Sequence, residues 1–325
     1  MKHLTLLQPF SHLATLFLLA TSAVSPFIGV TAIGATTDPA AGKPARSKPL
    51  ANPSKPAPDA KKWLLRYKFQ MGEVLRYRVR HTANVRTIIE ETTEQLESKS
   101  DSIKAWKVTD VLPDGSMEFV HVVEQVRMSN RRPNRALTEY DSQHDKTPPA
   151  GFEQAARAIG VPISVIRLAP DGRILDREEK IPQPEHTPDM PITPRLPDGP
   201  IRVGEKWNES YQVQAQRKSG TNLQIHTRRH CQLLKVDHGI ATFSVEYQIL
   251  TPVDAYIESQ LVERLTKGTV HFDLDHGRIV SQQMAVNRRI LGFSGGTSSM
   301  HFVAQMEERL LGPEEKLASK PDGRR

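Results

Sequence analysis

The chain has 325 residues, of which 38% are hydrophobic and 25% are charged, and its formal net charge is +7. This hydrophobic content is too high for a disordered protein, and the single cysteine excludes an intrachain disulfide framework. The positive charge lies mostly outside the segment 63–311, which carries 33 basic and 32 acidic residues. Because nucleic-acid-binding domains concentrate Lys and Arg where they contact phosphate, we expect no nucleic-acid partner.

The N-terminal residues 1–35 have the layout of a secretory signal peptide. Lys2 precedes an apolar run from Leu13 to Val24, and small residues follow. This layout predicts export to the periplasm or the extracellular space. The alternative is an uncleaved membrane anchor, because apolar residues continue to about Ile33 and a membrane span needs about 20 of them. Residues 36–62 contain six prolines among Ala, Lys and Ser, so we expect a disordered linker there.

A first lobe of antiparallel strands is expected in residues 63–181. After Gly72-Glu73, apolar residues between Leu75 and Val85 alternate with polar ones. Side chains of a strand point to opposite faces with a period of two, so this pattern indicates a strand with one buried face. A short amphipathic helix near Phe152 comes before the last hairpin of the lobe and should pack on the sheet.

The polar face of this first strand carries a ridge of four arginines. Guanidinium groups offer planar forks of donors, which suit an anionic lipid headgroup or a polysaccharide. Acidic residues follow closely in the sequence, and a neighbouring strand would neutralise the ridge through cross-strand pairs. We favour the self-paired interpretation, since exposed ion pairs are common and contribute little. The candidate ligand-binding residues are nevertheless Arg76, Arg78, Arg80 and Arg86.

The same order of signals recurs after a Pro-rich connector. Gly204-Glu205 begins an alternating strand, and an amphipathic helix near Ile257 again comes before a hairpin. An internal repeat of this kind predicts a mainly β fold of two tandem, similar lobes. Each lobe would be a curved antiparallel sheet or half-barrel with one short helix packed on it. The predicted segments are a signal peptide at 1–35, a linker at 36–62, lobes at 63–181 and 201–311, a connector at 182–200 and a disordered tail at 312–325.

Ser294 lies in a Gly-x-Ser-x-Gly pattern that resembles the nucleophile elbow of α/β-hydrolases. In that fold an acid and then a His follow the serine. Here the only His that follows is His301 and the only Asp is Asp322 in the tail, and the strands alternate as in antiparallel sheets. A Gly- and Ser-rich turn between two strands explains the pattern more simply. We therefore assign no catalytic residue, and a hydrolase is the last alternative.

Two clusters have the residue types of metal ligands. His226 and His230 adjoin Cys231, but residues four apart on a strand are separated by roughly 13 Å, too far for one ion. Cys231 fits better as a small buried hydrophobe, or as a free thiol that could pair with a second chain. Asp273 and Asp275 lack the other ligands of a calcium loop and fit a hairpin. We expect neither a metal nor a cofactor.

Several segments together are similar to an exported planctomycete protein family of unknown function. The resemblance covers about residues 63–311 and implies export without implying an activity. The segments are Trp63–Phe69 leading into Gly72-Glu73, Gly151–Glu153, Leu265–Val270, and Gly292–Gly295 near Ser298–Met300.

The sequence therefore predicts an exported, non-catalytic protein of the cell envelope. A curved sheet covered by amphipathic helices is a common way to make an apolar cavity, which would hold a lipid or another apolar envelope ligand. A structural or protein-interaction module, with another protein as partner, is the alternative. An enzyme is less expected, because no convergent set of acid, base and nucleophile emerged.

Overall fold

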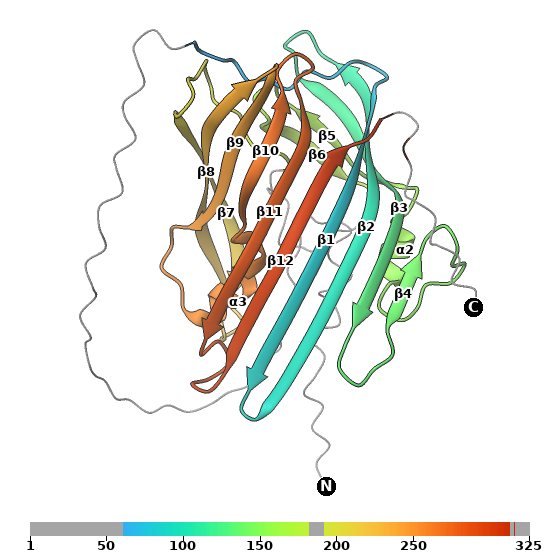
Figure 1. Cartoon of the computed structure of the whole chain (residues 1–325), viewed down its shortest axis with the longest axis vertical. Helices are drawn as coiled ribbons and strands as arrows, with labels where there is room; N and C mark the ends of the chain where they lie inside the picture. Colours follow the sequence, from blue (N-terminus) through green and yellow to red (C-terminus); the bar gives the residue numbers. More distant parts are fainter. Residues whose placement is uncertain (1–60, 182–191, 313–314, 316–325) are drawn as a thin grey trace, which may run out of the picture.

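A computed structural model describes residues 61–181, 192–312 and 315 (Figure 1). The predicted signal peptide lies outside the described residues, as do most of the linker, part of the connector and most of the tail. Twelve strands form one large antiparallel sheet that is open and curved, with helices on one side. The prediction of a mainly β fold is confirmed. Within the described ranges, no helix has the length and apolar character needed to cross a membrane.

The elements follow one another in two similar series. The first half contains β1 (Val74–Ile89), β2 (Thr92–Val111), β3 (Met117–Arg131), β4 (Thr138–Asp141), α2 (Glu153–Arg157), β5 (Pro162–Leu168) and β6 (Ile174–Glu179). The second half contains β7 (Lys206–Gln216), β8 (Asn222–Asp237), β9 (Ile240–Ile249), α3 (Ala255–Leu261), the 3₁₀ turn η2 (Val262–Arg264), β10 (Lys267–Asp273), β11 (Arg278–Leu291) and β12 (Ser299–Leu310).

Both halves have the same strand order. Across the sheet the strands run β6-β5-β3-β2-β1-β12-β11-β10-β9-β8-β7, and β4 pairs with β3. In the first half α2 comes between β3 and β5, and in the second half α3 comes between β9 and β10; both pairs of strands are antiparallel neighbours in the sheet. Strand β12 pairs with β1 on one side and with β11 on the other. The halves therefore belong to one continuous sheet, and two separate lobes are not confirmed.

The repeated Gly-Glu pairs form the same turn in both halves. In each turn the glycine N–H donates to the carbonyl of one residue in the second strand of that half, and the N–H of the same residue donates to the glutamate carbonyl. Gly72-Glu73 bonds in this way to Val108, at N–O distances of 3.1 and 2.9 Å. Gly204-Glu205 bonds to Leu233, at 2.7 and 3.0 Å. Both glycines have positive φ, which other residues adopt at a cost, so the sequence signal has a local physical cause.

One end of the sheet is closed by the segment 63–70, which we call the strap. This upper end, at the top of Figure 1, is where β1 and β7 begin. The strap N–H groups of Tyr67 and Lys68 donate to the carbonyls of Pro170, in the β5–β6 hairpin, and Gly277, in the β10–β11 hairpin, at 2.8 and 3.0 Å. The largest hydrophobic cluster fills this end and draws on the strap, the connector and both halves. Its aromatic members include Tyr67, Phe69, Tyr77, Trp106, Phe119, Phe243 and Phe272.

Candidate functional site

The two faces of the sheet differ in chemistry. Along β1 the odd-numbered side chains, such as Leu75, Tyr77 and Val85, are buried on the concave face, where the helices lie (Figure 1). The even-numbered side chains, including the four predicted arginines, lie on the convex face. Concave surfaces that are mostly apolar are the usual place for a ligand. The concave face is therefore the candidate site, and the arginine ridge lies on the opposite side.

Three of the four predicted arginines form ion pairs with acidic residues on neighbouring strands. The pairs are Arg76 with Glu124 at 2.9 Å, Arg78 with Asp101 at 2.5 Å, and Arg80 with Asp101 at 3.8 Å and Glu307 at 3.9 Å. These contacts favour the self-paired interpretation for most of the ridge. Arg86 differs, because it is exposed and the described residues give it no ion pair.

The residues that resembled metal ligands lie apart from the concave pockets described below. His226 and His230 are on β8, where His230 Nδ1 is 2.7 Å from Asn208 Oδ1. Cys231 is a free thiol with 1% exposure, and burial raises its pKa to about 12, so the thiol stays protonated. Asp273 Oδ1 accepts two backbone N–H bonds within its hairpin turn, both at 2.9 Å.

Ser294 lies in the turn between β11 and β12, two antiparallel strands. Its N–H donates to Ser298 Oγ at 2.7 Å, and that hydroxyl donates to the Gly295 carbonyl at 2.7 Å. The predicted Gly- and Ser-rich turn is confirmed. A nucleophile elbow joins a strand to a helix, so this local structure is of a different kind.

The α3–η2 segment packs on the concave face of the second half. Asp254 caps α3, because its Oδ1 accepts the Ile257 N–H at 2.9 Å. Ile257 and Leu261 are buried against β7 and β8, as expected for the amphipathic helix that the sequence predicts near Ile257. Val262 belongs to a different cluster, formed mainly by β1, β11 and β12. The segment therefore crosses the concave face from the edge of the sheet toward its centre.

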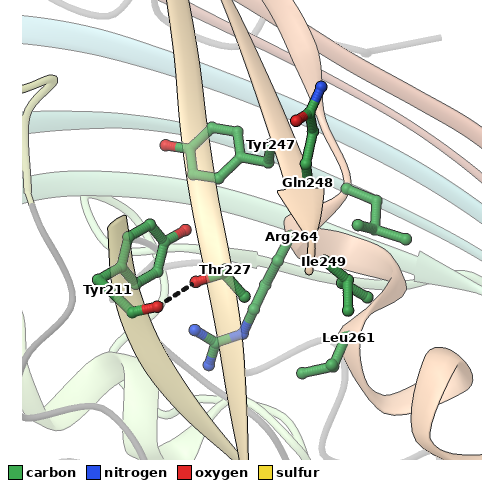
Figure 2. A pocket seen from close by; sticks show the side chains of 8 residues that line it. Tyr211, Thr227, Tyr247, Gln248, Ile249, Leu261 and Arg264 are labelled. Carbon is green, nitrogen blue, oxygen red and sulfur yellow. Dashed lines mark hydrogen bonds between the residues drawn. The ribbon is translucent and has the colours of Figure 1, made fainter. Parts of the chain in front are cut away.

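Two small pockets flank η2, and its two charged residues face different ones. Arg264 lines the first pocket with Tyr211, Tyr247 and Thr227, whose hydroxyl donates to the Tyr211 carbonyl at 2.9 Å (Figure 2). Glu263 lines the second, in which half of the lining residues are Met, Phe or Ala and the other half are polar. Their volumes are about 10 and 30 Å³. Each is thus about the size of a water site in this conformation.

The second pocket holds two ionisable groups in their neutral forms. Burial raises the pKa of Glu263 to about 7, against a small opposing effect of Arg264. Burial also lowers the pKa of His81, which lines the same pocket, to about 4. Near pH 6 both side chains are therefore uncharged. Sequence reasoning missed this pair, although a signal existed: His81 takes an inward position in a strand whose other inward residues are mostly apolar.

A buried ion pair lies on the concave face between the upper core and the first pocket. Arg229 is 1% exposed, and its Nη1 is 3.0 Å from Glu209 Oε2 and 2.9 Å from the Thr193 carbonyl oxygen. Its guanidinium also stacks over the Tyr247 ring, 4.9 Å from the centroid. The sequence signal was again the two-residue alternation of a strand. Arg229 is an odd-numbered residue of β8, so it shares the concave face with buried Ile225 and the other odd-numbered residues.

Small side chains form a row across the four central strands of the concave face. The strand registers place Ser98 of β2 opposite Ala83, Ala83 opposite Ala304, and Ala304 opposite Val286. The neighbouring rows contain larger residues, among them Met306 on one side and Phe302 on the other. Three inter-strand spacings make this row roughly 14 Å long. Three of its members, Ala83, Ala304 and Val286, are buried in the same cluster as Val262 of η2, and we call the row the trough.

Comparisons with protein-family models and with curated proteins gave no match. Among solved structures, the chain is similar to one described as "lipid-protein interactions in lipovitellin", at 12% sequence identity and a TM-score of 0.42. The similarity covers 78% of this chain and 26% of the lipovitellin chain, so the protein spans about a quarter of that relative.

Proposed function

We propose that this protein is an exported, non-catalytic envelope protein that binds an apolar chain, such as the acyl chain of a lipid, on the concave face of its sheet. The observation that carries the proposal is the row of small side chains beneath α3–η2. Rows of large side chains border it, so a chain lying across the strands would be held from both sides. Apolar walls with a few polar groups nearby are typical of sites for such ligands.

The α3–η2 segment would have to move for the ligand to enter, because the pocket beneath it holds little more than water. Besides the apolar contacts of Ile257, Leu261 and Val262, its polar contacts with the sheet are partly exposed. Gln260 exchanges two hydrogen bonds with the backbone of Gln216, at 2.9 and 2.7 Å. Glu258 pairs with Arg288 at 2.7 Å on the solvent side. Displacing Val262 from the cluster would open the trough, at a cost that the apolar contacts of the ligand offset.

Filling the trough should abolish ligand binding. We expect that Ala304→Phe lowers the affinity for a fluorescent fatty acid at least tenfold, because the ring would occupy the space between β1 and β11. Ala285→Phe is the matched control, since Ala285 is exposed on the convex face of the neighbouring strand. Thermal unfolding confirms that both variants fold, and Ser98→Leu serves as a second filling variant if Ala304→Phe does not.

The wild-type chain provides the simplest check of the same proposal. Protein purified without detergent should carry an acyl species that mass spectrometry detects after denaturation. If the wild-type chain carries none and also fails to bind the fluorescent probe, the proposal is wrong. Mass spectrometry of the chain recovered from the periplasm tests export, since removal of residues near 1–35 would shorten it by a defined mass.

A protein-interaction module is the second candidate, and the edge strand β7 favours it. The backbone of Leu233 on β8 bonds to the Gly204-Glu205 turn, on the β7 side of the strand. The carbonyl of His226, also on β8, accepts the N–H of Leu250, on the β9 side. The odd-numbered residues of β8 therefore direct their backbone N–H and C=O groups toward β7. Every second residue of β7, from Lys206 to Gln214, consequently directs its backbone N–H and C=O away from β8. Such an edge can accept an extended strand of another protein.

Cross-linking in cells would test this second candidate. A photo-reactive amino acid at Gln212, on the β7 edge, should give an adduct with one defined protein. The same group at Gln283, which is exposed on the convex face of β11, is the control. Equal adducts at both positions, or none at Gln212, would argue against a partner strand at this edge.

A further inference from the structure

The convex face changes in character from one end of the sheet to the other. Near the upper end and the middle, arginines lie beside carboxylates, as Arg76, Arg78, Arg80 and Arg127 all do. Toward the lower end, where the β1–β2 and β11–β12 turns lie, the acidic partners are missing. Four exposed basic residues here have no ion pair among the described residues: Arg86, Lys99, Arg131 and Arg289.

The strand registers bring these four residues onto one surface, which we call the basic patch. Arg86 lies opposite His301, and His301 lies opposite Arg289 on the next strand. Nε2 of His301 is 2.9 Å from Oδ1 of Asn287, so the hydrogen-bond partner of this imidazole is an amide and not a carboxylate. Two carboxylates lie at the β2–β3–β4 side of the basic patch: Glu97 of β2 is opposite Arg131, and Glu139 of β4 is opposite Ser129, the residue that pairs with Lys99. Two further glutamates, Glu90 and Glu91, lie below the basic patch in the β1–β2 turn.

An apolar margin borders the basic patch. Leu291 is 65% exposed and follows Arg289 by two residues, so it projects from the same face. Ile88, half-buried, follows Arg86 in the same way. Both lie opposite Ser299, one on each side of it. A single exposed leucine is ordinary on a protein surface, so its weight in the argument comes from its position beside cations that form no ion pair with the described residues.

We propose that the basic patch docks on an anionic phospholipid membrane. The guanidinium and ammonium groups would contact the headgroup phosphates, and Leu291 would enter the interface. The charge complementarity and the apolar margin together favour a membrane over a soluble polyanion, which offers nothing for Leu291 to contact. The inference does not depend on the proposed function, since the basic patch and the trough lie on opposite faces of the sheet.

Vesicle binding by the full chain tests the proposal. The readout is the ratio of affinities for vesicles of phosphatidylglycerol and phosphatidylcholine in equal parts and for vesicles of phosphatidylcholine alone. Any contribution from apolar N-terminal residues acts on both and cancels. Each basic residue near an anionic surface contributes about fivefold in affinity, so Arg86→Gln with Arg289→Gln should lower the ratio by about 25-fold.

Three matched variants make the result specific. Arg80→Gln is the control, because Arg80 already lies near Asp101 and Glu307, and its ratio should stay near that of the wild type. Glu97→Gln should raise the ratio, and Leu291→Ser should lower binding to both kinds of vesicle. An unchanged ratio in the double variant would overturn the proposal. So would loss of dextran sulfate binding in that variant with no effect of Leu291→Ser on vesicles, which would assign the surface to a soluble polyanion.

Discussion

Replacing Arg229 with methionine is expected to lower the free energy of unfolding by about 3–5 kcal/mol. The substitution removes the guanidinium but leaves the Glu209 carboxylate, whose side chain is only 12% exposed, without its charged partner. It also leaves the Thr193 carbonyl without its donor. An unpaired buried charge costs far more than the ion pair itself contributes, so the loss should exceed that for an ordinary surface change. Urea unfolding followed by tryptophan fluorescence measures it.

Two further variants separate the charge from the packing. Arg228→Met alters the adjacent arginine, which donates to Gln248 Oε1 at 3.1 and 2.8 Å on the convex face, and we expect a loss of at most about 1 kcal/mol. In Arg229→Met combined with Glu209→Gln, no buried charge remains, so much of the lost stability should return. If Arg229→Met costs no more than Arg228→Met, or if the double variant recovers nothing, the buried ion pair does not have the role described here.

Local features of the fold were predictable because they have local causes. Alternation with a period of two marked the strands, and the glycines with positive φ marked the Gly-Glu turns. The stripe around Ile257 gave the helix that packs on β7 and β8. The joining of the halves was not predictable in this way. It depends on β12, which forms a local hairpin with β11 but also pairs with β1, and the β1–β12 register joins residues more than 200 positions apart in the chain.

The site was harder to predict than the fold, because the core was located by assuming that inward-facing positions are apolar, and the site contains polar residues at such positions. Arg229, His81 and Glu263 are charged or ionisable residues in places where the pattern expects apolar ones. Their partners lie on other strands, so no spacing in the sequence links them. The exposed arginines of β1 attracted attention through their regular spacing, yet most of them serve ion pairs. Only Arg86 lies in a setting that still suggests a ligand.

The effect of Glu263→Gln on stability is expected to depend strongly on pH. Glu263 has a pKa of about 7 in the folded chain, against 4.5 as its ordinary value. Between these values the folded state binds more protons at Glu263 than the unfolded state does, so the contribution of Glu263 to the free energy of unfolding falls as the pH rises through this range. The loss is at most about 3 kcal/mol. Glutamine cannot ionise, so the free energy of unfolding of the variant should rise relative to that of the wild type from pH 4.5 to 7. Above about pH 8 the difference should stay constant.

His81 in the same pocket has the opposite dependence, which makes the test sharper. Its pKa falls to about 4 in the folded chain, so the unfolded state binds more protons up to about pH 6.5 and the contribution of His81 to stability grows over that range. The two contributions offset each other in the wild type. In His81→Asn the free energy of unfolding should therefore fall with rising pH, because only Glu263 still contributes. In Glu263→Gln it should rise with pH, because only His81 still contributes. Glu258→Gln, which only breaks the exposed pair with Arg288, should show neither trend. A pH-independent difference between Glu263→Gln and the wild type would mean that the carboxyl group is hydrated, and that η2 does not seal the trough.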